Sequence, residues 1–235
     1  MSEPVLEIKD VRKNYSGLRP LRIRMLAIAE GERVAISGPD AGAAEMLVNL
    51  VTGATLPDAG TVATFGRATG EISNGDEWLA SLDAFGILSP RAVMLDAATV
   101  QQNLAMPFTL EIDPIPGDIV EKVAALAREC AIDADALSSR AGEQSPVTRA
   151  RVHLARAVAL GPKLLVLEHP TAGVQDADRI PLAETVAAVA AARNLATLAI
   201  TQDLDFAETM AHRRLALEPA TGALLPWKRK RGWFR

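Results

Sequence analysis

The chain is poor in aromatic residues and in side chains that bind metals. Phe, Trp and Tyr make up 4% of its 235 residues, and it has one cysteine and three histidines. A single thiol excludes an internal disulfide and a cysteine-based metal cluster. The histidines, His153, His169 and His212, lack the spacing of metal ligands. The scarcity of aromatics also weighs against a surface on which nucleic-acid bases stack.

Positive charge and long apolar runs are scarce as well. The formal net charge is −4, so no overall positive field attracts nucleic acid, and we expect none as a partner. No apolar run reaches the roughly 18 residues that a membrane span needs. Residues 1–10 lack the basic and apolar regions of a signal peptide. We therefore expect a cytoplasmic protein.

The composition is that of a chain with a sizeable core. Hydrophobic residues make up 49% and charged residues 23%, which excludes disordered, collagen-like and disulfide-stapled classes. The length suits one large domain, or one domain with a subdomain. Cys130 lies in a helix-patterned apolar stretch at 119–131, so we expect it to be a small buried hydrophobe.

The order of apolar patterns predicts an α/β fold. In the second half, helical patterns at 147–160 and 181–193 alternate with apolar strands at 164–167 and 195–201. This alternation is typical of a parallel sheet covered by helices. Near the N-terminus polar and apolar residues alternate, which predicts an added antiparallel β subdomain. The other expected elements are strands at 5–10, 21–29, 33–37, 61–65, 85–88 and 214–217, helices at 43–52, 119–131 and 206–211, and a polar loop at 69–76.

A strand, a glycine turn and a helix follow one another between residues 34 and 52, which is the setting of a phosphate-binding loop. Four further segments resemble the nucleotide-binding domain of ABC transporter ATP-binding proteins. They read DAATVQQNLAMPF (96–108), RARVHLARAVALGPK (149–163), GPKLLVLEHPTAGVQ (161–175) and ATLAITQDLDFAETMAHRRLALEPATG (196–222). They stand in the family's order and spacing, so the resemblance covers nearly the whole chain.

The resemblance implies an ABC ATPase fold. This is a P-loop NTPase-like parallel sheet covered by helices, with an N-terminal antiparallel β subdomain and a helical subdomain. The domain is expected over residues 1–225, with its helical subdomain at about 90–160. In the family two such domains sandwich ATP between the P-loop of one and the signature of the other. The implied partners are a transmembrane permease subunit, a second ABC ATPase or a second copy of this chain. Such a permease would hold the chain at the cytoplasmic membrane.

The P-loop departs from the family's pattern G-x-x-x-x-G-K-[ST]. Ala44 stands at the lysine position, Ala43 at the preceding glycine, and Glu45 at the hydroxyl that ligates Mg²⁺. Losing the lysine removes a charge-assisted contact worth roughly 1.5–3 kcal/mol. The positions that would bind nucleotide, if any does bind, are Tyr15, Gly38, Pro39, Asp40, Ala41, Gly42, Ala43, Ala44, Glu45 and Met46.

The other motif positions are replaced as well. The Walker B aspartate corresponds to Glu168, the catalytic glutamate to His169, and the H-loop histidine to Gln202. The glutamine of the Q-loop aligns with Pro90, within a slip of one residue, and the D-loop aspartate with Gln175. The LSGGQ signature corresponds to Gln144, Ser145, Pro146, Val147 and Thr148, where only the serine is kept. No catalytic residue is therefore expected.

The replaced residues allow two interpretations each. Asp40 and Glu45 either fill the anion site and stabilise the helix dipole, by about 0.3–1 kcal/mol each, or Glu45 ligates Mg²⁺ directly. His169 is either a structural residue or a general base. Glu168, like Glu45, is a candidate metal ligand. Tyr15 is either a packing residue or a platform for adenine.

We therefore predict a degenerate ABC ATP-binding subunit that does not hydrolyse ATP and has a structural or regulatory role. If ATP with Mg²⁺ binds, we expect weak binding. One alternative is a genuine ABC ATPase that works slowly with substituted ligands. A second is a module that binds another ligand in the vacated P-loop cleft. The transported substrate is not encoded in these motifs.

The last ten residues, PWKRKRGWFR (226–235), differ in composition from the rest of the chain. They combine basic residues with aromatics, which is a pattern suited to contact with an anionic membrane surface. The alternative is a solvated tail.

Overall fold

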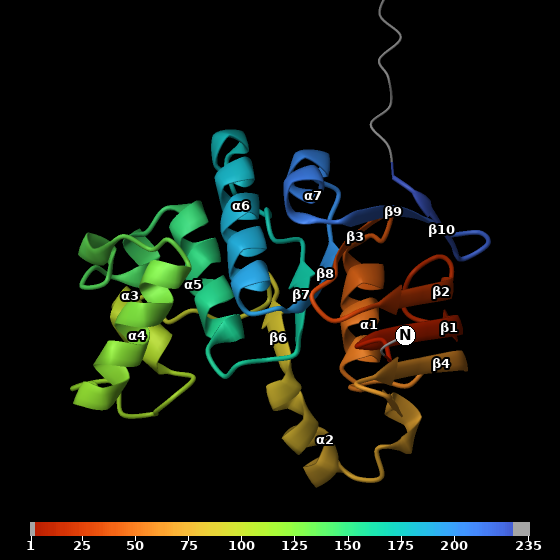
Figure 1. Ribbon diagram of the computed structural model, residues 1–235, viewed down its shortest axis with the longest axis horizontal. Coiled ribbons are helices and arrows are strands. Elements are labelled where there is room, and N and C mark those ends of the chain that lie inside the picture. The colour runs from red at the N-terminus through yellow and green to blue at the C-terminus, as the bar shows by residue number, and fades with distance from the viewer. Residues whose placement is uncertain (1–2, 228–235) are drawn as a thin grey trace, which may run out of the picture.

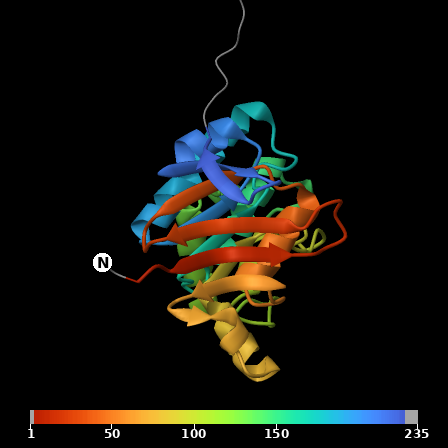
Figure 2. The same ribbon diagram turned by 90° about the vertical axis from the view of Figure 1, so that its right-hand side faces the viewer.

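The structure is a computed structural model that describes residues 3–227, and it contains two sheets (Figure 1). One sheet has four antiparallel strands in the order β2-β1-β4-β5. Its strands are β1 (Leu6–Lys13), β2 (Leu21–Ile28), β4 (Ala59–Thr64) and β5 (Arg67–Ala68). Figure 2 shows β1, β2 and β4 side by side across one face of the molecule. This sheet confirms the expected antiparallel subdomain.

The second, central sheet has the order β10-β9-β3-β8-β7-β6. All of its neighbouring strands are parallel except for β10, which is antiparallel to β9. The strands are β3 (Arg33–Ser37), β6 (Phe85–Leu88), β7 (Leu164–Glu168), β8 (Ala196–Ile200), β9 (Arg213–Glu218) and β10 (Ala223–Pro226). The predicted parallel sheet covered by helices is confirmed.

Helices lie on both faces of the central sheet. The helices of the described residues are α1 (Ala41–Val51), α2 (Gly75–Ser81), α3 (Val100–Ala105), α4 (Gly117–Glu129), α5 (Pro146–Val158), α6 (Asp176–Ala192) and α7 (Leu204–Met210). α1 covers one face of the sheet and α5 and α6 the other, whereas α2 projects away from the sheet beyond β6 (Figure 1). In Figure 1, α3, α4 and α5 form a helical layer on the side away from β1 and β2. Among residues 3–227, no helix combines the length and the apolar character that crossing a bilayer would take.

The central sheet separates two hydrophobic cores. On β7, Leu164 and Val166 point to the core shared with α1 and the antiparallel sheet, whereas Leu165 and Leu167 point to the core shared with α4, α5 and α6. All four side chains are fully buried. This two-sided burial explains why the strand is a continuous apolar run in the sequence.

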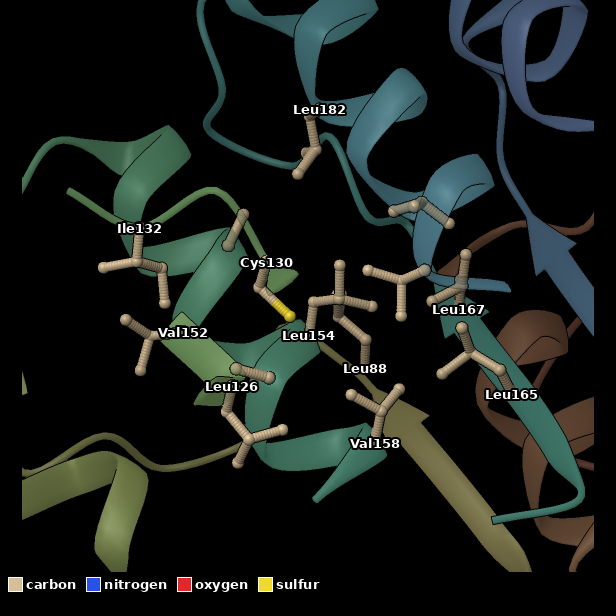
Figure 3. Packing of buried hydrophobic residues seen from close by; sticks show 14 of the residues in the cluster. Leu88, Leu126, Cys130, Ile132, Val152, Leu154, Val158, Leu165, Leu167 and Leu182 are labelled. Carbon is tan, nitrogen blue, oxygen red and sulfur yellow. The ribbon is translucent and has the colours of Figure 1, made fainter. Parts of the chain in front are cut away.

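Cys130 lies where we expect it, inside the helical layer. It is fully buried at the end of α4, near Leu126 and Leu154 (Figure 3). Burial raises the pKa of its thiol to about 12, because the thiolate would lose its hydration. The cysteine therefore behaves as an apolar core residue.

The segment at 69–76 corrects the sequence prediction of a polar loop. A short 3₁₀ turn occupies Thr69–Glu71, and α2 begins at Gly75. Asn74 caps α2 by accepting the N–H of Glu77, whose carboxylate pairs with Arg67 at 2.5 Å. The predicted tail at 226–235 lies outside the described residues from position 228 onward.

Candidate functional site

The loops that carry the predicted site residues meet at one edge of the central sheet. β3, β8, β7 and β6 lie side by side and parallel, so their carboxyl ends share that edge. Ligands of open α/β sheets bind at this edge. The segments that follow these strands begin near Gly38, Thr201, His169 and Ser89. The fold therefore brings the P-loop, Walker B and H-loop positions together.

Gly38 makes the turn that leaves β3. Its φ is +108°, and a Cβ atom there would lie 2.8 Å from the backbone oxygen of Leu217 on β9. Glycine is needed for both reasons. Pro39 follows, and its carbonyl accepts a hydrogen bond from Nε2 of Gln202 at 3.0 Å. Gln202, the residue at the H-loop position, therefore bonds to the backbone of the P-loop.

Asp40 caps α1 from within the loop. Its backbone is extended, and its Oδ1 accepts the N–H of Ala43 at 2.8 Å. Its carbonyl accepts the N–H of Ala44 at 2.8 Å, which begins the helical pattern. One of the donors that a P-loop offers to phosphate is thus already bonded to a carboxylate of the chain.

The two alanines after Gly42 bring no charge into the loop. Ala43 is 5% exposed, and Ala44 is fully buried against the core that α1 shares with both sheets. A methyl group therefore stands where the P-loop lysine would reach the phosphates. A longer side chain at position 44 would have to find room in a closely packed interior.

Glu45 corrects one part of the sequence interpretation. We expect it beside Asp40 at the helix N-terminus, but α1 begins at Ala41, directly after its cap, so Glu45 is the fifth residue of the helix. It lies beyond the first turn, where the dipole effect has faded. Its carboxylate instead pairs with Nη1 of Arg91 at 2.7 Å.

Glu168 is a buried carboxylate with two partners from the segment after β6. Its side chain is 3% exposed, and its Oε2 accepts hydrogen bonds from Oγ of Ser89 at 2.7 Å and from Nη2 of Arg91 at 2.8 Å. Arg91 thus bridges Glu45 on α1 and Glu168 on β7. The N–H of Arg91 also donates to Oγ of Ser89 at 3.2 Å, which fixes the turn.

His169 leaves β7 in a left-handed backbone conformation, with φ +45°. Its N–H donates to the carbonyl of Ile200 at 2.9 Å, so the turn is anchored to β8. The residue lines a cavity of about 350 Å³ with Arg179 and Gln202. His169 and Arg179 therefore border the same cavity, where Arg179 pairs with Asp176 and Asp203.

Tyr15 lies against the start of α1. A Cβ atom on Gly42 would be 3.3 Å from Cε2 of the ring, and one on Gly17 would be 2.5 Å from it. Burial, and then the nearby Asp40 carboxylate, raise the pKa of the phenol. The ring borders a cavity of about 390 Å³ that Asp40 and Pro39 also line.

The segment at the signature position lies elsewhere. Ser145 caps α5 by accepting the N–H of Thr148 at 3.2 Å, and Pro146 occupies the first turn. α5 packs on one face of the central sheet and α1 on the other. Residues 144–148 therefore do not join the P-loop within one chain (Figure 1).

Comparison with protein-family models decides the family. The model described as "ABC transporter" matches residues 21–172, which is well over half of the chain. The chain belongs to the ABC transporter family.

Several curated ABC proteins are similar in sequence. The Fe(3+) ions import ATP-binding protein FbpC of Serratia marcescens is 29% identical over 226 residues, which are 93% of this chain and 63% of that protein. The methionine import ATP-binding protein MetN of Brucella abortus is 28% identical over 92% of this chain and 58% of that protein. YxdL of Bacillus subtilis, an ABC transporter ATP-binding protein, is 26% identical over 85% of this chain and 78% of that protein. This chain thus spans about three fifths of the length of relatives such as FbpC.

Solved ABC cassettes share the fold. A dimeric structure of the cassette MJ0796 matches with a TM-score of 0.75 at 18% identity, covering 97% of this chain and all of that one. CbiO1 of Clostridium perfringens, part of the transporter complex CbiONQ, matches with a TM-score of 0.76 at 18% identity, over 95% and 88%.

The residues at the site differ from those with which a P-loop NTPase holds Mg-ATP. A P-loop holds the phosphates with backbone N–H groups and a lysine, and Mg²⁺ with a Ser or Thr hydroxyl and an aspartate. Here a carboxylate has bonded to the N–H of Ala43, a methyl replaces the lysine, and Arg91 lies between the two acids at the metal positions. Within residues 3–227, no group of three or more His, Cys, Asp and Glu side chains is placed to hold a metal.

Sequence reasoning missed Ser89 and Arg91, the two residues that flank Pro90. Pro90 itself was aligned with the Q-loop glutamine. An arginine next to that position, together with acids at positions 45 and 168, is a visible signal of charge compensation. Arg91 is 46 positions from Glu45 and 77 positions from Glu168 in the sequence, so no local pattern predicts these two ion pairs.

Proposed function

We propose that this chain is a subunit of an ABC-type transport assembly that does not hydrolyse ATP and has a structural or regulatory role. The observation that carries the proposal is the state of the P-loop. Its helix N-terminus is capped by Asp40, and Ala44 is a buried methyl group at the lysine position. Both features remove interactions that hold a triphosphate.

The replacements at the catalytic positions support the same conclusion. A general base accelerates hydrolysis only when phosphate and water are already positioned in front of it. His169 would have to act without the P-loop lysine. Gln202 donates to the carbonyl of Pro39. A histidine alone therefore does not restore the reaction.

The proposed partners follow from the relatives. FbpC and MetN are named as ATP-binding proteins for import, and MJ0796 has been solved as a dimer. We propose that this chain likewise joins an import complex, with a permease subunit and a second cassette or a copy of itself. A permease would hold it at the cytoplasmic side of the membrane. The domain proposed for these contacts is 1–225, with its helical subdomain at about 90–160.

A phosphate-release assay on the purified chain tests the proposal. We expect no release of phosphate from Mg-ATP above that of the buffer. His169→Ala and His212→Ala serve as a matched pair, because His212 lies at the start of β9 and its Nδ1 accepts the N–H of Arg33 at 3.3 Å. Turnover that is lost in His169→Ala and kept in His212→Ala contradicts the proposal. Turnover that is equal in all three proteins, and that a mock purification without the chain does not show, also contradicts the proposal.

A further inference from the structure

Arg91 is a cation placed between two acids from different elements. Its Nη1 lies 2.7 Å from Oε2 of Glu45, and its Nη2 lies 2.8 Å from Oε2 of Glu168. The guanidinium is planar, and its two outer nitrogens point to separate carboxylates, which suits it to such a bridge. The three charges together form what we call the acid–arginine–acid bridge.

The two acids need this cation. Glu168 is almost fully buried, and a buried carboxylate is tolerated only when it is paired and hydrogen-bonded. Both of the partners that its Oε2 has, Ser89 and Arg91, come from the single turn that follows β6. Glu45 is half exposed and adds a second negative charge on the other side of the guanidinium.

The position of the bridge coincides with the position of a metal. Glu45 and Glu168 stand at the P-loop hydroxyl and the Walker B aspartate, which together hold Mg²⁺ in P-loop NTPases. An arginine keeps its charge at every physiological pH. Because Arg91 is part of the chain, it does not dissociate as a metal ion does. A divalent cation would have to displace it or lie beside a like charge.

The bridge also joins two parts of the fold. Arg91 lies in the segment between β6 and α3, which leads from the central sheet into the helical layer. Its two ion pairs tie that segment to α1 and to β7, and the N–H of Arg91 adds a bond to Ser89.

We propose that Arg91 is a built-in replacement for the divalent cation. It closes the metal position, and it holds the segment that leads to the helical layer against the core without Mg²⁺ or nucleotide. The inference rests on the proposed function, because a chain that turned over Mg-ATP would need a metal at this point. The two fail in different measurements, namely phosphate release for the function and metal binding without nucleotide for Arg91.

Manganese binding tests the first part of the proposal, that Arg91 closes the metal position. Binding is measured from the loss of the electron paramagnetic resonance signal of free Mn²⁺. The unchanged chain is compared with Arg91→Gln and with the control Arg214→Gln, whose arginine is similarly exposed but pairs with Glu208. We expect Arg91→Gln to bind Mn²⁺ about tenfold or more tightly than the other two, because a positive charge beside two carboxylates is removed. Arg91→Gln combined with Glu168→Gln should lose the gain. Equal binding by the unchanged chain and Arg91→Gln overturns the proposal.

Hydrogen exchange tests the second part of the proposal, that the bridge holds the segment without Mg²⁺ or nucleotide, first in the unchanged chain and then in two variants. We expect amide protection in residues 89–99 to be the same with and without millimolar Mg²⁺ or Mg-ATP. Glu45→Ala, which removes only a half-exposed side chain, should speed exchange in that segment, whereas Arg214→Gln should not. Protection that rises when Mg²⁺ is added, or that is unaffected by Glu45→Ala, overturns the role of the bridge.

Discussion

Replacing Asp40 separates its capping role from its charge. The Asp40 side chain accepts the N–H of Ala43 at 2.8 Å, and α1 carries six buried residues in the core between the two sheets. Loss of such a cap costs about 1 kcal/mol, within a range of about 0.5–2 kcal/mol. We therefore expect Asp40→Ala to lower the free energy of unfolding by about 1 kcal/mol or more. Asp40→Asn keeps an acceptor and loses only the charge, which is worth about 0.3–1 kcal/mol at a helix N-terminus.

Urea unfolding followed by far-UV circular dichroism measures these differences, and in a chain of this size about 1 kcal/mol lowers the Tm by about 2–4 °C. Asn74→Ala is the matched comparison. It removes the cap of α2, a helix with no buried residue, so we expect a smaller loss of stability. If Asp40→Ala is as stable as the unchanged chain, Asp40 does not hold the loop. If Asp40→Asn lowers the free energy of unfolding as much as Asp40→Ala does, the stabilisation comes from the charge of Asp40 and not from its hydrogen bond.

Three other predictions concern the loop, the core and the tail. Ala44→Lys alone should not give Mg-ATP binding in calorimetry, because Asp40 keeps its carboxylate at the N–H of Ala43 and would pair with the new ammonium. Asp40→Ser, Ala43→Gly, Ala44→Lys and Glu45→Ser together should recover some affinity; tight binding by the single variant would refute the idea that Asp40 fills the anion site. Cys130, with its thiol pKa near 12, should resist a thiol reagent at mildly alkaline pH until urea unfolds the chain. Co-sedimentation with anionic liposomes of the full chain and of a form without the residues after Pro226 separates the two interpretations of the tail: equal sedimentation indicates a solvated tail, whereas a loss on truncation at low salt indicates membrane contact, to which each basic residue would add about 1 kcal/mol.

Much of the fold was predictable because its strands have clear patterns. The continuous apolar runs of β7 and β8 indicated strands buried on both faces, and both are interior strands of the sheet. α2 and α3 escaped prediction because each is short, with seven and six residues. Both have visible caps in the sequence, Asn74 with Glu77 and Thr99 with Gln102, so this error was avoidable.

The sequence predicted which residues lie at the site, but not which of them contact one another. The motif positions named Asp40, Glu168 and Gln202 as site residues, and each of them follows or ends a parallel strand at the same edge of the central sheet. One of the two interpretations of Glu45, that it stabilises the helix dipole, was wrong because the helix was expected to start at Ala43 and in fact starts at Ala41, after the cap. The bridge through Arg91 depends on how far a long side chain reaches across three elements. That reach is a property of the folded chain.

Titration calorimetry of Mg-ATP into the unchanged chain tests the central claim, that the chain's own side chains have closed the nucleotide site. The account predicts millimolar or weaker binding, with no gain when Mg²⁺ is added to ATP. Micromolar binding that depends on Mg²⁺ would contradict it.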